Sequence, residues 1–137
     1  MSGLSIFDVA GRAMAAQQVR LNTVASNLAN AQTVSGSADT AYHALRPVFE
    51  TNYPGNQEGS GLATVDAVEV KQSTAEPEKR YSPTNPLADK DGYVYGTNVD
   101  TNEELVDMLE ASRQYQNNIE VLSTAKSLML KTLSIGK

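Results

Sequence analysis

Apolar residues recur at helical spacing in two long segments, one at each end of the chain. In the first segment a large residue returns every seven positions, and a second, weaker set of positions follows three residues after each. The two sets are Phe7, Met14, Leu21 and Leu28, and Ala10, Gln17, Val24 and Ala31. This spacing is the a and d pattern of a coiled coil. It predicts a helix over about 5–31 that begins with a capping box between Ser5 and Asp8.

The second segment carries the same alternation of three and four residues over a longer stretch. No proline interrupts 101–135, and Gly136 stands where a helix should end. Thr101 with Glu104 offers a capping box, and Asp100 is a competing cap. The periodic positions are Leu105, Met108, Ser112, Tyr115, Ile119, Leu122, Lys126, Met129 and Leu133. Further apolar residues between 109 and 130 widen this surface beyond one seam, so the helix is expected to need more than one neighbour.

The segment between these helices has a different composition. All five prolines and six of the nine glycines lie in 36–98. The alternation of apolar and polar residues predicts strands at 44–50 and 63–73, separated by a loop at 52–61. Residues 78–96 are predicted to be extended and punctuated by turns, the tightest of them at Asp91 and Gly92.

These elements predict a mainly α fold. Long N- and C-terminal helices form a coiled coil, with a small β-rich excursion between them. The corresponding divisions of the chain are an N-terminal coiled-coil helix at 1–33, a β-rich middle segment at 34–98 and a C-terminal coiled-coil helix at 99–137. The middle segment is too short to hold a large core of its own.

Composition removes several classes of function. The chain has 11 Lys and Arg against 16 Asp and Glu, a formal charge of −5, and no basic run, which argues against a nucleic-acid partner. It has no cysteine and a single histidine, His43, so thiolate and His-rich metal sites are excluded. No apolar run approaches the roughly 18 residues of a membrane span.

Three groups of polar residues are candidates for a functional site. Residues 89–92, Asp-Lys-Asp-Gly, resemble part of a calcium loop but lack the other ligands at the required spacing, so a turn is the better interpretation. Ser37, Asp39 and His43 lie close together in sequence, whereas catalytic triads join distant segments. None of these predicts catalysis, a metal site or a cofactor.

The third group is a set of carboxylates at the start of the second helix. It comprises Glu103, Glu104, Asp107 and Glu110. Such residues favour the positive end of a helix macrodipole, and we expect them to keep the outer face of the helix wet.

Three asparagines in the first helix carry the most information. Asn22, Asn27 and Asn30 recur within nine positions, although asparagine is a mediocre helix former. One interpretation is a solvated polar face. The other is a polar face that is also buried, where short amides pair with neighbouring backbones. Residues 13–33 contain only Arg20 as a charged residue, and this scarcity favours a helix packed on all sides in an assembly.

The residues at both ends resemble those of a known family. "LNTVASNLANAQT" at 21–33 resembles the N-terminal signature of flagellar axial proteins, the rod and hook components. The closing helix carries the family's Met-(Leu/Ile)-x-(Ala/Ser)-x-Arg-x-Tyr-x-x-Asn core as Met108, Leu109, Ala111, Arg113, Tyr115 and Asn118. "GLSIFDVAGRAM" at 3–14 and "YSPTNPLADKDGYVYGTNVD" at 81–100 narrow the match to the proximal rod.

The resemblance implies a structural subunit of the flagellar basal-body rod, without enzymatic activity. Such a subunit polymerises into the axial drive shaft that crosses the periplasm and transmits torque. Its expected partners are other copies of itself, other rod proteins and the flagellar type III export apparatus. The residues expected at the assembly interface are Phe7, Met14, Leu21, Asn22, Val24, Asn27, Leu28, Asn30, Leu105, Met108, Tyr115, Ile119, Leu122, Met129 and Leu133.

Two other functions are alternatives to a rod subunit. A cytoplasmic coiled-coil adaptor would use the same heptads, but it predicts charged flanking positions and a solvated outer face, which the first helix lacks. A periplasmic cell-wall hydrolase would need a carboxylate or metal constellation in the middle segment, and the sequence offers none there.

Overall fold

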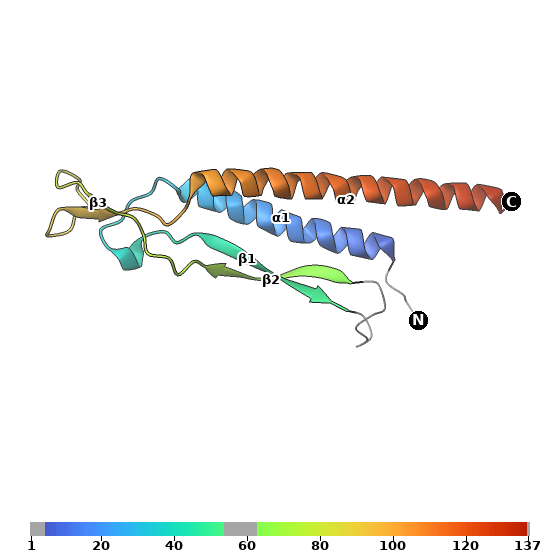
Figure 1. The fold of residues 1–137 in the computed structure, drawn as a ribbon, viewed down its shortest axis with the longest axis horizontal. Helices are drawn as coiled ribbons and strands as arrows, with labels where there is room; N and C mark the ends of the chain where they lie inside the picture. Colours follow the sequence, from blue (N-terminus) through green and yellow to red (C-terminus); the bar gives the residue numbers. More distant parts are fainter. Residues whose placement is uncertain (1–4, 54–62, 137) are drawn as a thin grey trace.

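Two antiparallel helices form the long axis of the molecule. The fold was obtained as a computed structural model, which describes residues 5–53 and 63–136. Helix α1 spans Ile6–Asn30 and helix α2 spans Thr101–Ile135. The helices lie side by side, and α2 runs on well past the beginning of α1 (Figure 1). Two long terminal helices with a small β excursion between them were predicted, and this arrangement is confirmed.

The helix boundaries follow from local chemistry. Ser5 Oγ accepts a hydrogen bond from the Asp8 N–H at 3.2 Å, and the Asp8 carboxylate accepts one from the Ser5 N–H at 3.0 Å, which completes the predicted capping box. The bond from the Ser5 N–H, together with a second bond that the Ser5 hydroxyl donates to the Asp8 carboxylate, lowers the pKa of Asp8. Helix α2 is capped by Asp100, the competing cap, whose carboxylate accepts from the N–H groups of Asn102 and Glu103.

Two small antiparallel hairpins make up the middle of the chain. A 3₁₀ turn, η1 (Ala38–Thr40), precedes the first hairpin, which consists of β1 (Leu45–Asn52) and β2 (Thr64–Gln72) and extends along α1. The second hairpin consists of β3 (Lys79–Tyr81) and β4 (Tyr93–Tyr95), at the end of the molecule away from the C-terminus (Figure 1). The predicted loop at 52–61 lies largely outside the described residues.

The turn between β3 and β4 closes where the sequence predicted it. Gly92 adopts φ +82°, a conformation that glycine tolerates and most other residues avoid. A Cβ atom there would also lie 3.0 Å from the Tyr81 ring. Tyr81 in turn packs edge-on against Tyr93, with ring centroids 5.2 Å apart. Glycine at this position therefore lets the hairpin close tightly.

The core lies where α1 meets α2 and the first hairpin, and small residues dominate it. The buried residues of the two helices are Ala10, Ala16, Thr23, Val24, Asn27, Glu104, Ala111 and Ala125. In α2 the buried Ala111 lies seven residues after Glu104, and the buried Ala125 lies fourteen residues after Ala111. Each of these positions is one residue before a member of the periodic set predicted from Leu105. The distance between packed helices depends on the side chains at the contact. Alanine allows the close approach that leucine at the same position would prevent.

Candidate assembly interface

One buried amide ties α1 to the beginning of β1. Asn27 has none of its surface exposed. Its Nδ2 donates to the Leu45 carbonyl at 2.9 Å, and its Oδ1 accepts from the Leu45 N–H at 2.8 Å. The Tyr42 hydroxyl donates to the same Oδ1 at 3.0 Å. Of the two interpretations of the asparagines, the sequence favoured burial against the backbones of an assembly; Asn27 is buried, but the backbone that it pairs with belongs to its own chain.

A second asparagine, Asn98, holds the residue just before β1. Asn98 Oδ1 accepts from the Ala44 N–H at 2.6 Å, and its Nδ2 donates to the Ala75 carbonyl at 2.7 Å. The Ser73 N–H donates to the Ala44 carbonyl at 2.7 Å. Sequence reasoning did not single out Asn98, because its partners lie more than twenty residues away and no local pattern points to them.

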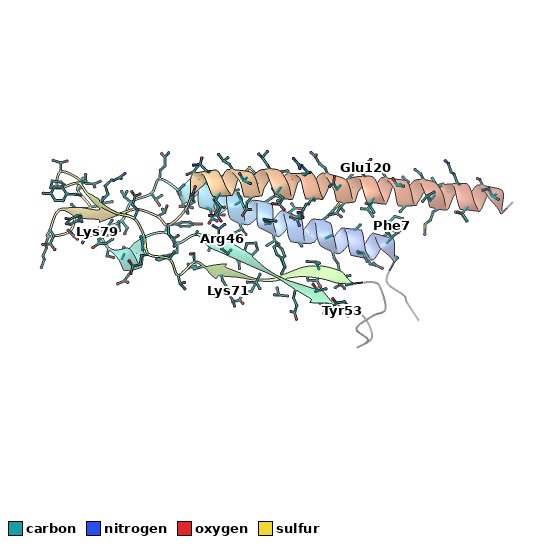
Figure 2. The ribbon with its side chains drawn as sticks, viewed as in Figure 1. Phe7, Arg46, Tyr53, Lys71, Lys79 and Glu120 are labelled. Atoms are coloured by element: carbon teal, nitrogen blue, oxygen red, sulfur yellow. The ribbon has the colours of Figure 1, made fainter. Side chains whose placement is uncertain are left out.

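An ion-pair network joins the hairpin to both helices. Arg46 Nη1, from β1, lies 2.9 Å from Glu104 Oε1 and 3.6 Å from Asp107, while Nη2 lies 3.2 Å from Glu103. Arg20 of α1 pairs with the same Asp107 at 2.9 Å. Arg46 therefore reaches from the hairpin toward the helices, and its label marks that place in Figure 2.

The prediction that these carboxylates keep a helix face wet is wrong for Glu104, whose side chain is fully buried. Its contact with Arg46 is close enough for an ion pair but does not have hydrogen-bond geometry, and neither carboxylate oxygen has a hydrogen-bond partner among the described residues. The stabilisation of Glu104 is therefore mainly electrostatic and rests on Arg46. Burial raises the pKa of Tyr42, and the negative charge of Glu104 raises it further.

We name this region, where Asn27, Asn98, Arg46 and Glu104 hold the start of β1, the polar junction. Its bonds join α1, the first hairpin and α2 within one chain. The sequence could not reveal the Arg46–Glu104 pair because 58 residues separate the partners, and a run of acidic residues at a helix start has a common local explanation.

The residues predicted for the interface fall into three classes by exposure. Val24 and Asn27 are buried inside the chain. Phe7, Met14, Leu21, Leu28, Asn30, Met108, Tyr115 and Leu122 are half-buried, and Asn22, Leu105, Ile119, Met129 and Leu133 are exposed. The exposed group offers atoms to a partner directly, whereas the buried pair can act on assembly only by maintaining the fold.

The last part of α2 has no cover from α1. Every residue from Lys126 to Gly136 is exposed, and we name residues 126–135 the free end of α2. It presents large apolar side chains to solvent: Leu128, Met129, Leu130, Leu133 and Ile135 are 57–84% exposed. A groove of about 860 Å³ runs along the same end, lined by Ile6, Val121, Thr124, Leu128, Thr132 and Leu133. Contiguous exposed apolar surface of this kind is typical of surfaces that bind a partner.

The other polar groups act within loops. Asp89 Oδ1 accepts from the N–H groups of Asp91 and Tyr93, both at 2.9 Å, and the bond from Tyr93 is the main reason that its pKa is lowered. Ser37 contacts Thr40, whereas the His43 ring lies against the Ser73 carbonyl. Across 5–53 and 63–136, no three His, Cys, Asp or Glu side chains are grouped to hold a metal ion. No helix in these ranges is long and apolar enough to cross a membrane.

Comparison with known proteins settles which family carries this fold. Two family models match, "Flagella basal body rod protein" at residues 7–35 and "Flagellar basal body rod FlgEFG protein C-terminal" at residues 90–135. The flagellar basal-body rod proteins FlgC of Salmonella typhimurium and Escherichia coli are 49% and 47% identical to the chain, and that of Yersinia enterocolitica is 46% identical. Each match covers all of both chains. The chain belongs to the FlgC family of flagellar basal-body rod proteins.

Membership of the FlgC family gives the chain its role and its place. It is a structural subunit of the flagellar basal-body rod and not an enzyme. The two matched regions coincide with α1 and its exit, and with the segment from the β3–β4 turn through α2. The family's recurrent parts are therefore the two helices that pack together in this structure.

Proposed function

We propose that this FlgC-family protein polymerises with further copies and with other rod proteins into the proximal rod, the axial shaft that transmits torque through the periplasm. The free end of α2 carries this proposal. A lone chain leaves at least five large apolar side chains there in water, although burial of each is worth about 1.5–3 kcal/mol. Neighbouring subunits that cover them gain this energy.

The mode of packing that we propose is a coiled coil of the two terminal helices, extended by neighbouring helices. Within the chain, α1 and α2 already exchange a hydrogen bond from Gln17 Nε2 to Gln114 Oε1 at 2.8 Å and the Arg20–Asp107 ion pair. Residues 1–33 and 99–137 form the assembling unit in this proposal, and residues 34–98 a separate module held by the polar junction. Contacts between unlike surfaces of identical subunits generate an open helical array.

Export is part of the proposal. A rod that grows beyond the inner membrane needs its subunits delivered to its tip, and we assign that step to the flagellar type III apparatus. The small middle segment and the lean core favour this route, because a chain that buries little surface unfolds at low cost.

The proposal is tested by placing a charge on the free end of α2. Leu133→Asp should leave the isolated chain as stable as before, because Leu133 is 69% exposed. It should nevertheless abolish rod formation and swimming, because assembly would bury an unpaired carboxylate. Val68→Asp, on a 53% exposed residue of β2, is the matched control and should be tolerated. Normal swimming of the Leu133→Asp strain would contradict the proposal.

A further inference from the structure

The groove at the free end of α2 continues the track along which α1 packs. Buried Ala111 and Ala125 lie fourteen residues apart on the inner face of α2, and Thr132 follows Ala125 after seven more. Helix α1 begins at Ile6, which lines the groove together with Ala125 and Thr132. Beyond Ile6 the same face of α2 continues without α1 against it. The groove therefore has the shape and spacing to accept another helix.

The charges around this groove differ from those at the other end of the same helix. Residues 121–137 contain Lys126, Lys131 and Lys137 and no acidic residue. Residues 100–110 contain five carboxylates and no basic residue. At 100° per residue, Lys126 and Lys131 fall on opposite flanks of the groove. Glu120 lines its inner end, so the positive flanks lie toward the outer end.

The acidic start of α2 also exposes an apolar ridge. Leu105, Val106 and Leu109 are 47%, 62% and 71% exposed, on the side of α2 that faces neither α1 nor the hairpin. Arg46 and Arg20 pair with three of the neighbouring carboxylates. Glu110 has no ion-pair partner within the described part of the chain and makes only a bond from Gln114. The ridge thus places apolar side chains beside Glu110, a carboxylate without an ion-pair partner among the described residues, and this complements the lysines of the groove.

We propose that the groove at the free end of α2 receives the Leu105–Leu109 ridge of a second copy of this chain. Leu128 and Leu133 pack against Val106 and Leu109 of that copy, and Lys131 approaches its Glu110. The contact joins unlike surfaces, so it leaves a free groove on one copy and a free ridge on the next. This inference rests on the proposed function and adds the identity of the partner and the part of it that binds.

The natural chain has no cysteine, which permits a direct test by disulfide cross-linking. A Leu109→Cys, Leu133→Cys variant is expressed in cells, basal bodies are isolated, and the chain is oxidised and run under non-reducing conditions. The two positions are 24 residues apart on one helix, about 36 Å, so they cannot cross-link within a chain. We expect covalent species of three or more copies. Leu133→Cys with Val68→Cys is the matched control and should give none.

Absence of these species from intact basal bodies would overturn the identity of the partner. If Leu133→Asp still blocked assembly in that case, another rod protein would occupy the groove, and the proposed function would stand. A swimming Leu133→Asp strain would remove the proposed function itself. If the Leu133→Cys, Val68→Cys control gave the same covalent species in equal amount, the inference would also be contradicted. The cross-links would then reflect only the high local concentration of chains.

Charge reversal provides a second test that does not depend on the cysteine variants folding. Lys131→Glu should reduce association of the purified chain about two- to fivefold, the range expected for one exposed ion pair. Adding Glu110→Lys to the same chain should restore it, because both partners are reversed in every copy. If the double variant associated no better than Lys131→Glu alone, Glu110 of a second copy would not face the groove.

Discussion

The two ends of α2 differ in what covers them. At its start the helix contacts α1 and β1, Glu104 and Ala111 are fully buried, and Arg46 neutralises the carboxylate that burial would otherwise destabilise. At its free end α1 is absent and residues with large apolar side chains face water. The chain therefore completes one end of its helix pair by itself and leaves the other to neighbouring subunits. A structural subunit needs both features: a region that holds its own shape, and an exposed apolar surface that neighbouring subunits can cover.

The largest effect is expected from a charge within the polar junction. Asn27→Glu should lower the free energy of unfolding by about 3 to 5 kcal/mol, because it buries a charge and removes the donor to the Leu45 carbonyl. Asn30→Glu is the matched control. Asn30 is half-buried and donates to the Ser26 carbonyl within its own helix, so a change below about 1 kcal/mol is expected. Urea denaturation of the two purified variants measures the difference, and equal losses would contradict the burial of Asn27.

The next effect concerns the Arg46–Glu104 pair. Arg46→Met should destabilise the chain by about 2 to 3 kcal/mol, since it leaves Glu104 buried without a counter-charge. Adding Glu104→Met should recover most of that loss, because a buried ion pair can be replaced by apolar side chains of similar size. Thermal unfolding of the single and double variants tests this. A double variant no more stable than Arg46→Met would show that Glu104 is not the group that needs Arg46.

A smaller effect is expected from overfilling the seam between the helices. Ala111→Leu should cost about 1 to 3 kcal/mol, because Ala111 is fully buried where the backbones approach closely. Leu109→Gln, two residues earlier and 71% exposed, should change the stability of the isolated chain by less than about 0.5 kcal/mol. Denaturation curves distinguish the two, and a tolerated Ala111→Leu would mean that the seam has room for larger side chains.

The smallest effect is a local dependence on pH at the β3–β4 turn. The N–H of Tyr93, and then that of Asp91, donate to Asp89 and hold its pKa below the usual 3.8. A carboxyl group whose pKa is lowered by folding stabilises the folded state at pH values above its pKa in the unfolded chain. This contribution is lost as the pH falls through its pKa in the folded state. The turn should therefore loosen below about pH 4, seen as a shift of the Tyr93 amide resonance. Asp89→Asn should remove the pH dependence, and a shift that persists in that variant would assign it to another group.

Local chemistry made the secondary structure predictable. The absence of proline over 101–135, an acidic cap before the first turn and a glycine at position 136 determine both ends of α2. The reciprocal bonds of Ser5 and Asp8 likewise define the start of α1. The β3–β4 turn follows from the need for a positive φ at Gly92.

Contacts between distant segments were beyond the reach of the sequence pattern. The periodic leucines of α2 predicted a seam one residue away from the buried positions, because the seam is set by how closely the backbones can approach and not by the largest side chains. Glu104 has the local signature of a solvated helix start, and only Arg46, far away in the chain, explains its burial. The sequence favoured pairing of the Asn27 amide with a backbone group, but a helix pattern could not identify Leu45 as the partner.

Hydrogen exchange along α2 distinguishes a helix covered at one end from a helix covered along its whole length. In the isolated chain we predict slow exchange of the amides around Ala111 and fast exchange across residues 126–135, because only the first region is covered by the rest of the chain. In assembled rods both regions should exchange slowly. Equal protection of the two regions in the isolated chain, or fast exchange at the free end within assembled rods, would show that neighbouring subunits do not cover the free end of α2.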